Sequence, residues 1–267
     1  METERGLFGS DLQRKLQAAS LANVREYRDT PGAVFAARMA GTDDPDRFGW
    51  DRIKQVLRNE GAITFRMIPT DQCAPIEKKL AEIGCTISWW DVFDAQADEI
   101  KAACEHVLIS PCEDVVQLNA SASDNGNLFE SAQAFMAECG VAPYPAQVLS
   151  GSLGPAAFAA LSKPEDGSIV ATAFSYFPYN RYSEHWKTAW AGLVAVSEEM
   201  RGRGLGVFVN ALVLKSIVED YGAERVQEFA RTSNFASCKM IERCGLTLRK
   251  EFHAGIAQPC EATSFTR

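Results

Sequence analysis

The residues best suited to chemistry lie in residues 193–206, where an apolar run meets three closely spaced glycines. The segment reads Leu-Val-Ala-Val-Ser-Glu-Glu-Met-Arg-Gly-Arg-Gly-Leu-Gly. Glycine lets the backbone approach an anion closely, and the unpaired N–H groups of a first helical turn point at it along the helix dipole. Arg201 and Arg203 add positive charge. The segment therefore predicts a phosphate-binding turn between a strand and a helix, although a tight turn without a ligand stays open as the alternative.

Spacing excludes two common phosphate-binding motifs. A P-loop needs Gly-Lys followed by Ser or Thr, which is absent here. A dinucleotide fingerprint needs Gly or Ala three positions after its second glycine, and those places hold Val207 and Val209. The helix itself is well predicted, because apolar residues recur on one stripe from Leu205 to Ile217 while Asn210 falls outside that stripe.

The elements around this loop alternate between strand and helix patterns, which predicts an α/β (α+β) fold with a mixed sheet. Before the loop we expect a strand, a polar loop, a helix, a hairpin and a strand at residues 115–118, 119–127, 128–139, 156–176 and 190–196. After it we expect helix, strand, helix and strand at residues 205–221, 225–230, 234–244 and 247–252. The first part of the chain predicts four helices at residues 11–27, 53–61, 76–83 and 95–109, strands at 33–37, 63–68 and 86–93, and a polar loop at 41–46.

The glycine loop has a specific resemblance. Arg-x-x-Gly-x-Gly at Arg201, Gly204 and Gly206 directly follows Leu-x-x-Val and resembles the pyrophosphate loop of the GNAT (GCN5-related N-acetyltransferase) superfamily. About 30 residues later the family has a helix that begins with Asn and ends before Gly, and Asn234 to Gly245 matches that pattern. The resemblance covers residues 114–255, about half of the chain.

The resemblance implies a mostly antiparallel GNAT-type sheet flanked by helices, with acetyl-CoA or another acyl-CoA as co-substrate and no metal. The acceptor would be a primary amine of a small molecule or peptide, which attacks the thioester directly in a ternary complex. The backbone of Val194 and Val196 would follow the pantetheine, and Asn234 and Ser237 would lie near the thiol. The remaining cofactor contacts, to the pyrophosphate, would come from Arg201, Gly202, Arg203, Gly204, Leu205 and Gly206.

Two positions depart from the family pattern. The tyrosine that often protonates the departing thiolate falls on Ile241, and the base glutamate of some members falls on Trp190. The candidate catalytic replacements are Glu184, His185 and Ser237. Glu184 and His185 are also compatible with ordinary loop residues, and Asn234 with a simple helix cap. A noncatalytic acyl-CoA-binding or interaction protein therefore stays open as an alternative function.

The chain predicts two parts, an N-terminal α/β domain at residues 1–113 and the acyl-CoA-binding catalytic domain at residues 114–267. Residues 63–93 loosely echo residues 226–252, since each reads strand, helix, glycine, strand. Gly84 and Gly245 end the two helices, and Thr86 and Thr247 follow two residues later. This echo predicts that the N-terminal part is a degenerate GNAT-like copy that shapes the acceptor cleft.

Composition narrows the class of protein. The 267 residues carry a net charge of −8 with a sequence pI near 5.1, which argues against nucleic acid as a partner. Eight cysteines without a Cys-x-x-Cys pair, and three scattered histidines, give no metal-ligand spacing. The N-terminus shows no targeting pattern and no apolar run approaches a membrane span, so we expect a cytoplasmic protein without a membrane partner. The sequence does not indicate an oligomeric state.

Overall fold

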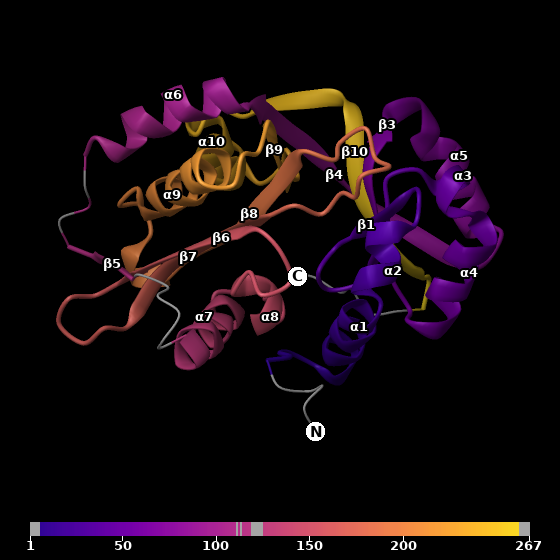
Figure 1. Ribbon diagram of the computed structural model, residues 1–267, viewed down its shortest axis with the longest axis horizontal. Coiled ribbons are helices and arrows are strands. Elements are labelled where there is room, and N and C mark those ends of the chain that lie inside the picture. The colour runs from indigo at the N-terminus through magenta and orange to yellow at the C-terminus, as the bar shows by residue number, and fades with distance from the viewer. Residues whose placement is uncertain (1–5, 111, 113, 119–124, 262–267) are drawn as a thin grey trace.

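The computed structural model describes residues 6–110, 112, 114–118 and 125–261. Ten strands form one sheet in the order β1-β2-β3-β10-β4-β9-β8-β7-β6-β5. Helices α1–α5 gather around one end of the sheet, and α6, α9 and α10 cover one face of the other end, with α7 and α8 on the opposite face (Figure 1). The expected mixed, mostly antiparallel sheet flanked by helices is confirmed.

The strands are β1 (Ala33–Phe35), β2 (Ala40–Thr42), β3 (Ile63–Pro69), β4 (Cys85–Gln96), β5 (Val116–Leu118), β6 (Ala156–Ser162), β7 (Ile169–Tyr176), β8 (Thr188–Val196), β9 (Arg225–Ala230) and β10 (Thr247–Pro259). The helices are α1 (Asp11–Ala22), α2 (Val24–Asp29), α3 (Pro45–Phe48), α4 (Trp50–Asn59), α5 (Thr70–Ala81), α6 (Ala97–Leu108), α7 (Asn125–Glu138), α8 (Ala146–Leu149), α9 (Leu205–Glu219) and α10 (Phe235–Arg243), with a 3₁₀ turn η2 (Glu198–Met200).

Strands from the two parts of the chain alternate within the sheet. β10, the last strand, lies between β3 and β4 and pairs antiparallel with both. β4 in turn lies between β10 and β9, so a strand from the first part completes the sheet of the second. The order strand, helix, glycine, strand is repeated as β3-α5-Gly84-β4 and β9-α10-Gly245-β10, in agreement with the echo in the sequence. The boundary at residues 113 and 114 stays a prediction.

Two strand pairs are parallel, and each opens into a fork. β2 pairs with β3 only at Gly41–Thr64 and Thr42–Phe65. β8 pairs with β9 over three residues and stops at Trp190–Gln227, although β8 continues to Val196. Helices α3 and α4 connect the strands of the first fork, and η2 and α9 connect those of the second. The second fork lies directly before the glycine loop predicted to bind phosphate.

The expected elements are found with shifts at their ends, and two of the expectations were wrong. The helix expected at residues 11–27 breaks at Asn23 into α1 and α2, and the polar loop expected at 41–46 contains β2 and α3. α8 was not anticipated. Asn210 is fully buried because neighbours cover α9 on more than one side. Of the loop expected at 119–127, residues 119–124 lie outside the described residues.

In the part of the chain that the structure describes, no helix is long and apolar enough to cross a membrane. The same residues contain no group of three or more His, Cys, Asp or Glu that could hold a metal ion.

Candidate functional site

A β-bulge in β8 sets the first wall of the site. Ala173 of β7 lies opposite two residues of β8, Leu193 and Val194, because the register shifts there. Leu193 has a positive φ of 54°, a conformation that a branched side chain rarely adopts. Its carbonyl accepts a hydrogen bond from Thr172 Oγ1 at 3.4 Å. The bulge reverses the alternation of side chains, so that Val194 and Val196 line the cleft beyond the fork.

The glycine loop forms the second wall. Gly202 and Gly204 have φ of 79° and 84°, in the left-handed region that favours glycine, and Gly204 is the N-cap of α9. Gly206 lies inside the helix with no such constraint. A Cβ at Gly206 would stand 3.5 Å from Val196 Cγ2 and 3.7 Å from Met240 Sδ, between the two walls. The glycine therefore leaves open a space that any side chain would fill.

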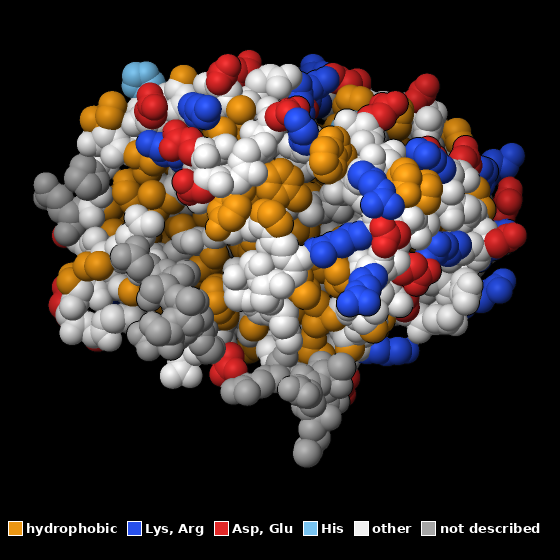
Figure 2. Space-filling view, in the orientation of Figure 1, with side chains coloured by type: hydrophobic (Ala, Val, Ile, Leu, Met, Phe, Trp, Pro, Cys, Tyr) orange, Lys and Arg blue, Asp and Glu red, His pale blue; other side chains and the backbone are white. Residues whose placement is uncertain are grey.

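The resulting cleft has a volume of about 770 Å³ and runs between the end of β8, the first turn of α9 and α10. Its charged lining residues are Arg201, Lys239 and Arg243, and among the described lining residues there is no carboxylate. Hydrophobic side chains show at the surface between α9 and α7 in the left half of Figure 2. An apolar channel that ends at three cations and a helix N-terminus suits a long ligand with phosphate groups at one end.

Most of the predicted cofactor residues come together in this cleft. The lining includes Val194, Val196, Arg201, Gly202, Gly204, Leu205, Gly206, Asn234 and Ser237. Asn234 also caps α10, because its Oδ1 accepts from the Ser237 backbone N–H at 3.2 Å. Arg203 is absent from the lining and forms an ion pair with Asp114 at 3.6 Å instead. A role for Arg203 in binding the cofactor stays a prediction.

Glu184 and His185 lie elsewhere, in a second cleft of about 320 Å³ that shares no lining residue with the first. Ser183 Oγ donates to the carboxylate of Asp43 and accepts from the His185 backbone N–H at 3.0 Å. Burial lowers the pKa of His185 and raises the pKa of Asp43. Of the three candidate catalytic residues, only Ser237 lies in the first cleft.

The two positions that depart from the family pattern are both buried. Ile241 is 2% exposed and packs in the core with α9. Trp190 belongs to the last pair of the fork, and its indole lies so close to Gly192 that a Cβ there would be 2.7 Å away. Neither side chain supplies an acid or a base at the cleft.

Sequence reasoning missed two groups of buried polar residues near the fork. One is Asn210 and Glu228, joined by a hydrogen bond from Nδ2 to Oε1 of 2.8 Å. Burial raises the pKa of Glu228 to about 7. The other group contains Arg66 of β3, Tyr176 of β7 and Gln227 of β9. No motif could reveal it, because three distant strands contribute its side chains.

The comparisons agree with this geometry. A family model described as "Acetyltransferase (GNAT) family" matches residues 130–246, which include β6 to α10 and the whole glycine loop. Residues 130–246 are therefore similar to a GNAT acetyltransferase domain. The comparison with curated proteins found no significant match.

Solved GNAT structures share the fold over most of the chain. A GCN5-related N-acetyltransferase from Kribbella flavida is 14% identical, with a TM-score of 0.55 over 92% of this chain and 96% of that one. A protein from Novosphingobium aromaticivorans, described as an acetyltransferase of the GNAT family, is 15% identical with a TM-score of 0.54, over 93% and 97%. A tandem GNAT protein from the clavulanic acid biosynthesis pathway is 14% identical with a TM-score of 0.51, over 85% and 77%. The likeness therefore extends beyond the matched domain into the N-terminal part.

Proposed function

We propose that this protein transfers the acetyl group of acetyl-CoA to a primary amine of a small molecule or peptide. The GNAT domain supports acetyl-CoA-dependent acetyl transfer in general. The observation that carries the proposal is the open fork between β8 and β9, which continues into a cleft ending at the glycine loop and three cations.

The residues of this cleft fit coenzyme A. Gly206 keeps the channel open between Val196 and Met240, where a pantetheine arm would lie. Positive-φ glycines direct the loop into the first turn of α9, whose free N–H groups suit a pyrophosphate. Lys239 and Arg243 stand one helical turn apart on α10 and add charge for a further phosphate.

Acetyl-CoA supplies an activated thioester, and the chain positions the two reactants. The amine nitrogen attacks the thioester carbonyl carbon, the C–N bond forms and the C–S bond breaks. The attacking nitrogen loses a proton and the departing thiolate gains one. The bulge gives β8 one extra residue opposite Ala173 of β7, and a backbone N–H left unpaired by such a bulge can polarise a carbonyl. Holding amine and thioester together supplies much of the rate.

Among the predicted catalytic residues, Ser237 is the candidate proton donor to the thiolate, since it lines the cleft. We leave Glu184 and His185 out of the proposed reaction because they line the second cleft. A noncatalytic acyl-CoA-binding protein is the second candidate. The observation that favours it is the burial of Ile241 and Trp190 where family members carry acid or base groups.

Thermal unfolding with and without acetyl-CoA or coenzyme A tests the cofactor. A ligand at about 100 times its Kd stabilises the fold by roughly 2.7 kcal/mol. Thioester consumption with a panel of primary amines then separates the two candidates. Binding without amine-dependent consumption would favour the noncatalytic protein, and no stabilisation at millimolar coenzyme A would contradict both.

A further inference from the structure

The apex of the β8–β9 fork holds buried hydrogen-bond donors without partners. Arg66, Trp190 and Gln227 are 4%, 9% and 0% exposed. In the described part of the chain, no partner is found for Arg66 Nε and Nη1, Trp190 Nε1 or Gln227 Nε2. A buried donor left unpaired costs about 1–3 kcal/mol, and folded proteins rarely leave one so. These three residues, the apex donors, therefore indicate a ligand that accepts hydrogen bonds.

The buried positive charge of Arg66 also indicates a ligand, in this case one that carries a negative charge. The guanidinium of Arg66 lies 5.3 Å from the ring centroid of Trp190 and 5.5 Å from that of Phe229. Its Nη2 donates a hydrogen bond to Tyr176 Oη at 3.3 Å. Burial raises the pKa of Tyr176, which keeps that phenol neutral. Within the described residues no carboxylate forms an ion pair with Arg66, so the cluster carries a buried positive charge that an anionic group would balance.

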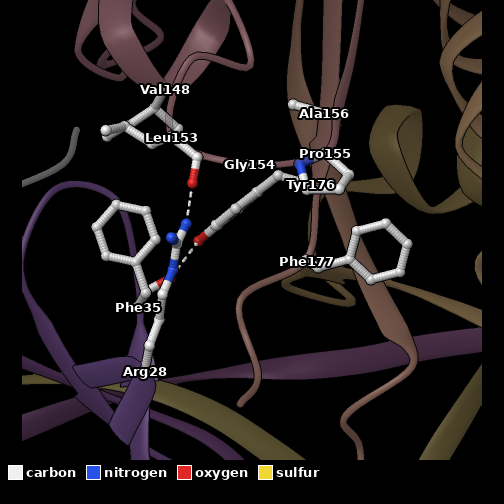
Figure 3. Close-up of a pocket in the computed structure, with 9 residues that line it drawn as sticks. All are labelled: Arg28, Phe35, Val148, Leu153, Gly154, Pro155, Ala156, Tyr176 and Phe177. Atoms are coloured by element: carbon white, nitrogen blue, oxygen red, sulfur yellow. Dashed lines mark hydrogen bonds between the residues drawn. The ribbon is translucent and has the colours of Figure 1, made fainter. Parts of the chain in front are cut away.

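A small cavity lies beside Tyr176, the hydrogen-bond partner of Arg66, and none of the apex donors lines it. Tyr176, whose hydroxyl donates to the Phe35 carbonyl at 3.0 Å, lines a cavity of about 40 Å³ together with Arg28 (Figure 3). A single water needs roughly 10–15 Å³. The cavity is therefore large enough for a group of a few atoms, but Tyr176 lines it and Arg66, Trp190 and Gln227 do not.

The apex donors lie where the β8–β9 fork opens toward the first cleft. Trp190 and Gln227 are the last residues paired before β8 and β9 separate. A ligand with its pyrophosphate at residues 201–206 and its arm along Val196 and Val194 runs back along β8 toward that pair. Its reactive end then approaches the apex donors. Arg66 comes from β3, so the N-terminal part supplies the charged group of this cluster.

We propose that the apex donors bind a carboxylate of the acceptor, so that the acceptor is an amine that also carries a carboxylate, such as an amino acid. This inference rests on the proposed function, because it places the acceptor opposite a thioester. Arg66 balances the negative charge, and the N–H groups of Trp190 and Gln227 add orientation. An amine without an anionic group would leave all of these donors unpaired.

The experiment measures binding to the full chain saturated with coenzyme A, by thermal shift and calorimetry. The probes are the standard amino acids, each compared with its carboxamide and with the amine that lacks the carboxyl group. We expect at least one amino acid to bind at least 10-fold more tightly than both counterparts. Phosphoethanolamine tests whether phosphate replaces carboxylate, and tighter binding of that probe than of every amino acid would overturn the assignment.

Two mild variants test the residues themselves. Trp190→Phe removes one N–H and keeps an aromatic ring, and Arg66→Lys keeps the charge while changing the donors. Each should weaken binding of the carboxylate-bearing amine about 10-fold and leave binding of the counterparts that lack the carboxylate unchanged. Arg58→Lys, on the exposed face of α4, is the matched control.

The outcomes separate the two proposals. If no carboxylate-bearing amine binds better than its decarboxylated counterpart, or if both variants bind it as the parent does, the inference is wrong. If coenzyme A itself fails to stabilise the parent chain, the proposed function fails instead.

Discussion

The two forks of this molecule have the same plan and opposite charge. In each, a short parallel pair opens and the first strand is followed by a segment with one short helix, α3 or η2. A longer helix then begins after a glycine with positive φ, Gly49 at 98° and Gly204 at 84°. The cleft of the β8–β9 fork is lined by three cations. The second cleft, at the end of the β2–β3 fork, is lined by Asp43, Asp44, Asp46 and Glu184 with Arg47.

Counted back from the two helices, Asp46 occupies the place of Arg201. A carboxylate at that place repels a phosphate, whereas an arginine attracts it. The β7–β8 loop, through Tyr182 to His185, also lines the second cleft. The comparison teaches that one backbone plan can carry two clefts of opposite charge. We expect the charge of the few side chains around each fork, and not the shared plan, to select the ligand.

The largest effect is expected from a substitution that fills only the cleft of the β8–β9 fork, which we call the basic cleft; the second cleft is the acidic cleft. Gly206→Leu should abolish stabilisation by coenzyme A, a loss in affinity of more than 100-fold, because the side chain would fill the space between Val196 and Met240. The fold should survive, since Gly206 is helical and the corresponding second residue of α4 is Asp51. Melting temperature with and without coenzyme A measures both effects. If coenzyme A stabilises the variant as much as the parent, the cofactor does not bind in this cleft.

The two forks also differ in the buried charge directly beyond the last pair, which is Arg66 in the first and Glu228 in the second. Burial raises the pKa of Glu228 from 4.5 to about 7. Below pH 4.5 the Glu228 carboxyl is protonated in both the folded and the unfolded state, so it does not lower the free energy of unfolding. As pH rises from 4.5 through 7, the unfolded state loses this proton before the folded state does, and the free energy of unfolding falls by roughly 3 kcal/mol.

Glu228→Gln should remove this dependence. The variant keeps an oxygen for the Asn210 Nδ2 hydrogen bond, and its free energy of unfolding relative to the parent should rise by roughly 3 kcal/mol between pH 4.5 and pH 8. Urea unfolding across that range measures it. Glu130→Gln, on the exposed face of α7, is the control, and parallel pH curves for parent and Glu228→Gln would contradict the buried acid.

The charge of the basic cleft can be lowered in steps. Lys239→Ala and Arg243→Ala should each weaken coenzyme A binding about 3- to 10-fold, with less salt dependence in the variants, because each removes one cation from the lining. Calorimetry at low and high salt measures both quantities. Equal affinity at both salt concentrations in the parent would show that these cations face no phosphate.

The smallest effect is expected in the acidic cleft. Asp46→Asn removes a charge that accepts from Trp50 Nε1 at 2.8 Å and lies 3.2 Å from Lys79 Nζ. Because Asp46 is exposed, stability should fall by less than about 1 kcal/mol. Coenzyme A should still bind once per chain with unchanged affinity. A change in stoichiometry would show that the acidic cleft also takes part.

The sequence by itself determined the part of the site that is formed by residues close together in the chain. The glycines and arginines of residues 201–206 lie close together in sequence, and the strand before them and the helix after them have clear periodicity. The loop and most of the residues that line the first cleft could therefore be predicted directly. Asn234 was placed from its spacing to the loop. Arg203 was not, because a sequence does not show that Asp114 lies beside it.

The tertiary structure alone decided which distant strands meet. Periodicity indicates whether a side chain faces a core, but it does not say which strand lies beside it, so the place of β10 between β3 and β4 was unreadable. For the same reason Glu184 and His185 seemed near the site in sequence but line another cleft. Arg66 joins Trp190 and Gln227 only because the two parts of the chain share one sheet. Burial of its charge is a property of that shared sheet and of no local pattern.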